Sequence, residues 1–173
     1  MGLDVTAFSR VRKLDCLFNE SGEPVGRITG EPFDDYAHAV ENPHYAERMG
    51  SIEPGYYAYE ESFHFRAGAY SRYNRWRDEL AKAAGWPLGS YHQYDRDWPS
   101  YAASAWDATE GLCWELINFS DCEGAIGPEA AAKLAADFDK ITEPPPAEHG
   151  FDTFADFKKA FALAANGGFI RFA

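Results

Sequence analysis

Cysteine, positive charge and long hydrophobic runs are all scarce in this sequence. The three cysteines, Cys16, Cys113 and Cys122, form an odd set without CxxC spacing, which argues against a disulfide framework and favours a reducing compartment. No apolar run approaches the ~18 residues that a membrane span needs, and the first residues lack the charged and apolar regions of a secretory signal. The sequence therefore predicts a cytoplasmic protein without a membrane segment.

Positive charge is outnumbered throughout the chain. Sixteen Lys and Arg residues stand against 28 Asp and Glu residues, which gives a formal net charge of −12. Nucleic-acid backbones and anionic membranes need a basic face, so the charge disfavours direct binding to either. The acidity serves solubility, or it lets the protein imitate nucleic acid and occupy the basic groove of another protein.

The common catalytic and metal-binding motifs are missing as well. The sequence contains no GxSxG, GxxxxGK[ST], GxGxxG or HExxH pattern, and the spacing of His38 and His44 suits no common helical zinc pair. Cys122 lies between Asp121 and Glu123, whose charges disfavour a thiolate nucleophile. We therefore expect no metal and no cofactor, and a binding protein rather than an enzyme.

Apolar and aromatic residues are plentiful, and their patterns predict a single α+β domain over residues 1–173. The sequence is 46% hydrophobic and 16% aromatic, and a chain of this length buries roughly 70% of its unfolded surface. We expect a small, mostly antiparallel sheet packed against about three helices. Alternation or apolar runs predict strands at 3–14, 56–67 (central), 112–119 and 169–172 (an edge strand), with a hairpin around 19–22 that returns through 24–28.

Helical spacing and capping residues predict the helices. Gly85 ends a periodic segment at 69–84, Pro128 and Glu129 open another helix, and Asp152 or Thr153 caps the last one. The stretch 31–53 is irregular, with one short helix around 34–40. Residues 86–106 are expected to form a long loop, and long loops are more often functional than merely connecting.

Arg77 is the residue that packing alone does not explain. On a helical wheel it falls inside the apolar arc that contains Tyr73, where an unpaired guanidinium costs several kcal/mol. It either pairs internally with a carboxylate such as Glu115 or Asp121, extends past the rings to water, or clamps an external phosphate or carboxylate. In the last case Arg66 is expected to assist it, and Tyr70 and Tyr73 offer stacking faces.

A dense run of short polar groups, NFSDCEG at residues 118–124, lies between an expected strand and an expected helix. Turns of this kind gather ligands in α/β-type folds, although Ser120 and Asp121 also serve simply as caps for backbone donors. We expect this run to face Arg77 across a pocket.

Three sequence stretches carry a resemblance to known proteins. MGLD at 1–4, FRAGAYSRYN at 65–74 and INFSDCEG at 117–124, followed by Gly127 and Pro128, resemble an uncharacterised group of small proteins from bacteriophages and prophages. The likeness spans most of the chain. It implies a phage accessory protein in the bacterial host cytosol, and phage genes of this size often encode factors that interfere with host systems.

Three hypotheses of function follow. The first is a non-catalytic binding protein that captures an anionic small ligand, such as a nucleotide. The second is an acidic inhibitor that mimics nucleic acid with segments 31–61 and 137–152 and binds a host protein. The third is a small hydrolase that uses His64 with Asp121 or Glu123 as acid and base. The expected ligand-binding residues of the first hypothesis are Arg66, Tyr70, Tyr73, Asn74, Arg77, Asn118, Ser120 and Asp121.

Overall fold

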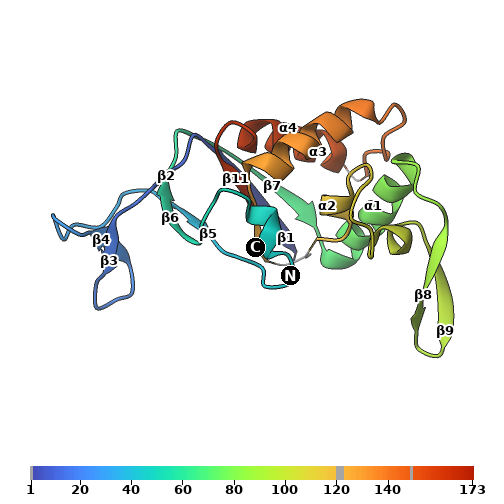
Figure 1. Ribbon diagram of the computed structural model, residues 1–173, viewed down its shortest axis with the longest axis horizontal. Coiled ribbons are helices and arrows are strands. Elements are labelled where there is room, and N and C mark those ends of the chain that lie inside the picture. Colours follow the sequence, from blue (N-terminus) through green and yellow to red (C-terminus); the bar gives the residue numbers. More distant parts are fainter. Residues whose placement is uncertain (1, 120–122, 149) are drawn as a thin grey trace.

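Four antiparallel strands in the order β10-β11-β1-β7 form the main sheet of the computed structural model, which describes residues 2–119, 123–148 and 150–173 (Figure 1). Its strands are β1 (Leu3–Ser9), β7 (Glu61–Gly68), β10 (Gly124–Ile126) and β11 (Phe169–Phe172). β1 pairs with β7 on one side and with β11 on the other. The segment 56–67, predicted as one central strand, is instead divided between β6 (Gly55–Ala58) of a smaller sheet and the edge strand β7, and the predicted edge strand 169–172 is interior.

Burial explains this reversal. Phe169 and Ile170 are consecutive and both fully buried, because helices cover one face of the sheet and a smaller sheet covers part of the other. That smaller sheet has the order β2-β6-β5, and its residues share a second apolar cluster with Phe8 and Phe169. An apolar run that is buried on both faces is typical of an interior strand. The strands of the smaller sheet are β2 (Arg12–Lys13), β5 (Ala37–Ala39) and β6 (Gly55–Ala58).

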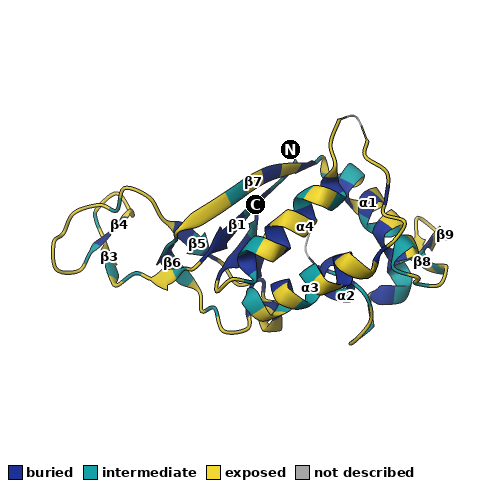
Figure 2. Cartoon of the chain, turned by 90° about the horizontal axis from the view of Figure 1, so that it is seen from above, coloured by how far each residue is buried: buried dark blue, intermediate teal, exposed yellow. Residues whose placement is uncertain are grey.

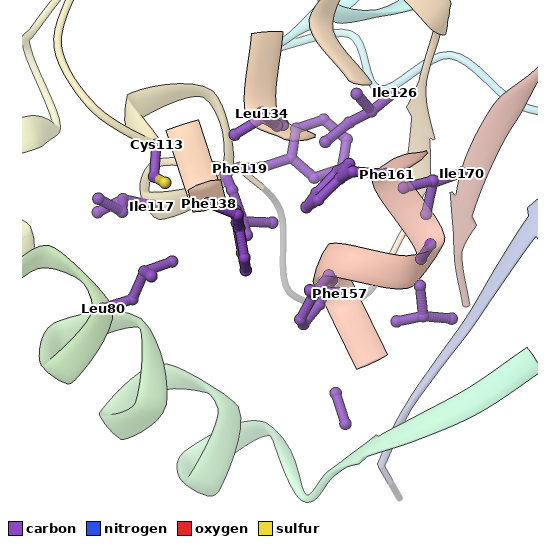
Figure 3. Packing of buried hydrophobic residues seen from close by; sticks show 14 of the residues in the cluster. Leu80, Cys113, Ile117, Phe119, Ile126, Leu134, Phe138, Phe157, Phe161 and Ile170 are labelled. Atoms are coloured by element: carbon purple, nitrogen blue, oxygen red, sulfur yellow. The ribbon is translucent and has the colours of Figure 1, made fainter. Parts of the chain in front are cut away.

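The helices pack on the other face, as the sequence predicts for three of them. They are α1 (Tyr70–Ala83), α2 (Trp114–Ile117), α3 (Pro128–Lys140) and α4 (Thr153–Ala164). Asp152 caps α4 by accepting a hydrogen bond from the Ala155 N–H. Figure 3 shows Phe157 and Phe161 of α4 among side chains of α1, α2 and the sheet. The predicted α+β class is confirmed.

Other segments also differ from the sequence predictions. Residues 3–14, predicted as one strand, form β1 and β2 in separate sheets. Residues 34–40 contain strand β5 instead of a short helix, and residues 112–119 contain helix α2 instead of a strand. The expected loop 86–106 is a hairpin of β8 (Gly89–Gln93) and β9 (Arg96–Ser100), followed by the 3₁₀ helix η2 (Ala102–Ala105). A further 3₁₀ helix, η1 (Ala46–Met49), lies in the irregular stretch.

Two hairpins project from opposite ends of the molecule. The hairpin predicted around residues 19–22 is confirmed, with β3 (Cys16–Phe18) paired to β4 (Pro24–Gly26), and it lies at the end away from β8 and β9 (Figure 1). Much of both hairpins is exposed (Figure 2). Within the described residues, no helix combines the length and the apolarity that crossing a bilayer requires.

Candidate functional site

The guanidinium of Arg77 lies flat on a buried ring and is oriented by two neutral oxygens. Its Cζ is 4.8 Å from the ring centroid of Tyr73, which precedes it by one helical turn on α1 and is fully buried. Nη1 donates to the carbonyl oxygen of Phe119, and Nη2 donates to the side-chain oxygen of Asn74. Neither acceptor carries a charge, so these bonds fix the group without neutralising it.

In the described part of the chain, no carboxylate of the protein neutralises the Arg77 guanidinium. Arg77 is in none of the ion pairs found there. Glu115, the first of the two carboxylates that sequence analysis offered as an internal partner, binds Lys133 at 2.7 Å instead. The second, Asp121, lies outside the described residues. Arg77 is only half-buried, so its charge is accessible.

Arg77 opens into a hollow of about 650 Å³, which we call the arginine cleft. A second hollow of about 370 Å³ shares Tyr45, Arg77, Trp106, Ile117 and Phe119 with it and extends to Asn118. Both volumes lie within the range of roughly 300–1,000 Å³ that small-molecule sites occupy. The cleft combines aromatic, polar and cationic groups from five parts of the chain: Tyr45, Ser71, Asn74, Arg75, Arg77, Asp78, Tyr91, Pro99, Ser100, Ala102, Trp106, Ile117 and Phe119.

Asp78 holds one part of the cleft lining in place. Its Oδ1 accepts hydrogen bonds from the Ser100 hydroxyl at 2.6 Å and from the Ala102 N–H at 2.9 Å. These bonds tie the end of β9 and the start of η2 to α1. They also position Trp106, which follows η2 and is 49% exposed, beside Tyr91 of β8 at 5.5 Å between ring centroids.

The structure brings only some of the predicted ligand residues together. Asn74 and Arg77 line the cleft, and Tyr73 lies beneath the guanidinium. Tyr70 packs against the core instead of lining the cleft. Asn118 borders the adjoining hollow, but its side-chain oxygen already accepts a hydrogen bond from Arg48. Ser120 and Asp121 lie outside the described residues.

Arg66 and His64 lie elsewhere, on the outer face of β7. Phe65 and Ala67 point into the core, so their neighbours are exposed, as the alternation of a strand requires. The His64 ring nitrogens lie 3.1 Å from the Thr6 hydroxyl and 3.9 Å from Asp4. Arg66 therefore does not join Arg77 in the cleft.

The proposed acid and base pair is separated by the sheet. His64 lies on β7, whereas Glu123 directly precedes β10 at the opposite edge. With about 4.8 Å between neighbouring strands, three spacings put the two strands roughly 14 Å apart. His64 and Glu123 are thus too far apart for direct proton transfer, and Asp121 lies outside the described residues.

Arg48 is a second desolvated arginine, which sequence analysis did not single out. Its side chain is 3% exposed and lies 4.0 Å above the Trp114 ring. It donates to Glu47 at 2.6 Å and to the Asn118 side chain at 3.0 Å, while its buried Nε has no partner within the described residues. Burial lowers the pKa of Arg48, partly opposed by nearby carboxylates. Arg48 lies in a stretch without hydrophobic periodicity, so no sequence pattern indicated that it is buried.

Another buried charge cluster joins α2 to α3. Lys133 reaches Glu115 and Asp137 at 2.7 Å each, and Asp137 also accepts from the Cys113 N–H. Burial raises the pKa of Asp137, but these hydrogen bonds outweigh it and lower the pKa below its usual value. Burial and Asp137 raise the pKa of the Cys113 thiol far above its usual value, so this cysteine is no nucleophile. Nowhere in the described ranges do three His, Cys, Asp or Glu side chains gather to hold a metal ion.

Many carboxylates in the two acidic segments bind neighbouring groups of the same protein. In the first segment, Glu60 and Glu61 bind Arg10, and Glu53 binds Lys13. In the second, Asp139 binds Lys158, and Glu148 binds Arg75. These pairs are exposed on both sides, so each offsets the negative charge only weakly, and the inhibitor hypothesis stays a prediction.

Comparison with known proteins identifies no relative of this chain. No protein-family model, curated protein or solved structure matches it. Any assignment of function therefore depends on the chemistry of the site.

Proposed function

We propose that this protein is a non-catalytic binding protein that captures an anionic small molecule in the arginine cleft. One observation carries the proposal: Arg77 is oriented by neutral oxygens and faces a hollow of ligand size without a carboxylate partner in the described chain. In a bacterial host cytosol, the setting that the resemblance to phage proteins implies, phosphate and carboxylate compounds are the expected guests. Holding such a compound is one way to interfere with a host system.

The chemistry of Arg77 suits an oxyanion. A guanidinium carries five N–H donors; two of those of Arg77 bind Phe119 and Asn74, and the other three have no acceptor among the described residues. Hydrogen bonds between a guanidinium and a phosphate or carboxylate are charge-assisted and often bidentate. Partial burial strengthens them, because the effective dielectric constant is lower than in water.

Local charge in the cleft is also favourable. Arg75 adds a second positive charge, and its 3.3 Å pair with Glu148 is exposed on both sides and therefore weak. Asp78 is the acidic residue of the lining, and two donors already bind it. The cleft is thus locally cationic within a protein of net charge −12.

Thermal unfolding of the full chain with inorganic phosphate, pyrophosphate, citrate and AMP tests the proposal. A bound anion at a hundredfold excess over its Kd stabilises the protein by about 2.7 kcal/mol, which raises Tm by roughly 5–11 °C for a domain of this size. Arg77→Met is expected to abolish the shift. Arg12→Met removes the same charge from an exposed position on β2, away from α1, and is expected to keep it.

Two outcomes would contradict the proposal. One is an unchanged Tm in the presence of each of the four anions. The other is a shift that is the same in wild type and in Arg77→Met, since the anion would then bind at another place.

A further inference from the structure

The geometry points to a nucleotide as the guest, with its base stacked on Trp106 and its phosphate bound by Arg77. This inference rests on the proposed function and specifies the ligand class. The aromatic residues of the cleft are not needed to bind a simple oxyanion, and they indicate a larger guest.

Binding of a bare anion would need no contact with Trp106. Its side chain is 49% exposed, whereas tryptophan is highly buried on average. It lines both hollows together with Arg77, so one guest can reach the indole and the guanidinium at once. Tyr91 of β8 contacts the indole at 5.5 Å between ring centroids and 46° between ring planes, and about half of the Trp106 side chain remains accessible to a guest.

A base is the planar group that fits such a platform. Stacking of a nucleic-acid base on an aromatic side chain is worth about 1–3 kcal/mol, and it tolerates any base because every base has a π-face. A cleft of about 650 Å³ also suits a base, sugar and phosphate together better than an isolated phosphate.

Asp78 adds a hydrogen-bond acceptor to the lining of the cleft. A carboxylate offers about four lone-pair sites, and Ser100 and Ala102 use two of them at Oδ1. The remaining capacity suits the hydroxyl groups of a sugar or an exocyclic amine, both of which nucleotides carry. A guest with a second anionic group at this position would be repelled.

The test separates the base from the phosphate. Calorimetric titration of the full chain with AMP, ribose 5-phosphate and inorganic phosphate compares three ligands that share the anion and differ in the rest. Wild type is expected to bind AMP about ten- to a hundredfold more tightly than ribose 5-phosphate. Trp106→Ala is expected to reduce AMP affinity to that of ribose 5-phosphate and to leave the latter unchanged, while Trp106→Phe keeps most of the preference.

Trp98→Ala is the matched control. Trp98 belongs to the same hairpin, its Nε1 donates to the Gln93 carbonyl, and Arg96 covers its ring, but it does not line the cleft. Its replacement is expected to preserve the preference for AMP. Loss of the preference in Trp98→Ala as well would assign the effect of Trp106→Ala to hairpin packing and overturn the nucleotide inference.

The outcomes distinguish the two levels of the proposal. Equal affinity for AMP and ribose 5-phosphate in wild type, or an unchanged preference in Trp106→Ala, overturns the nucleotide inference and leaves anion binding intact. Failure of all three ligands to bind overturns both. Loss of every ligand in Arg77→Met, with the preference intact in Trp98→Ala, supports both.

Discussion

Arg48 and Arg77 have the same side chain and contact neighbouring residues, Asn118 and Phe119, yet their surroundings differ sharply. Arg48 is enclosed: its side chain is 3% exposed, stacked on Trp114 and paired with Glu47. Arg77 is half-buried, lies on Tyr73 and opens into the arginine cleft. The first guanidinium joins η1 to α2, and the second presents donors to solvent.

Contact with a ring does not by itself distinguish a structural cation from a binding one. Both arginines have such a contact. What differs is the partner and the exposure: Arg48 binds the Glu47 carboxylate and is 3% exposed, whereas Arg77, among the described residues, binds neutral oxygens and lines a hollow. Charge that the protein does not neutralise, at a place that a ligand can reach, indicates a binding site.

Removal of the enclosed arginine is expected to have the largest effect on stability. Arg48→Met leaves the Asn118 oxygen without its donor and uncovers the Trp114 ring, which together cost about 2 kcal/mol and lower Tm by roughly 4–8 °C. Urea unfolding measures the change, with Arg12→Met, the same replacement at an exposed position, as the control. Unchanged or increased stability would mean that desolvation of the guanidinium outweighs its contacts.

An intermediate effect is expected at Asn118. Asn118→Ala removes one hydrogen bond to Arg48 and is expected to cost about 1 kcal/mol. Because the amide oxygen is already engaged, phosphate and AMP affinities should change less than twofold. Unfolding and titration of the same variant check both values. A tenfold loss of affinity would instead place Asn118 among the ligand contacts, as its sequence position suggested.

The smallest effect on stability is expected at the open arginine. Arg77→Met should cost under about 1 kcal/mol, since water in the cleft can bind the two oxygens that the guanidinium leaves. Ligand binding should be lost at the same time. If urea unfolding shows a loss as large as that of Arg48→Met, Arg77 is a structural residue and the contrast between the two arginines disappears.

Long, regular segments of the fold were predictable, and short ones were not. Helices α1, α3 and α4 have twelve to fourteen residues, enough to show apolar periodicity and capping. Strand β5 has three residues and α2 has four, and periodicity does not separate helix from strand over such lengths. Their conformation is set by the surfaces they pack against.

The hairpin of β8 and β9 was missed for a different reason. Its two-residue turn consists of Tyr94 and Asp95, both with positive φ (54° and 56°), as in a type I′ turn. Such turns usually contain Asn-Gly or Asp-Gly, so the sequence lacked the usual indication. The expected loop therefore turned out to be an ordered wall of the cleft.

The candidate site was predictable only where it lies on one helix. The placement of Arg77 over Tyr73 followed from their spacing of four residues on α1. The aromatic groups of the cleft did not, because Tyr45, Tyr91 and Trp106 come from separate segments that only the tertiary fold brings together. Arg66 was expected beside Arg77 and lies on an exposed strand face, since β7 and α1 direct their side chains differently.

The strand arrangement has a consequence for biosynthesis. β1 is synthesised before both of its neighbours, β7 and β11, which lie about 60 and 165 positions further along the chain. The apolar side chains of β1 therefore lack one sheet partner until β11 has been translated. We expect the sheet to assemble slowly, and a nascent chain stalled before β11 to remain bound to chaperones.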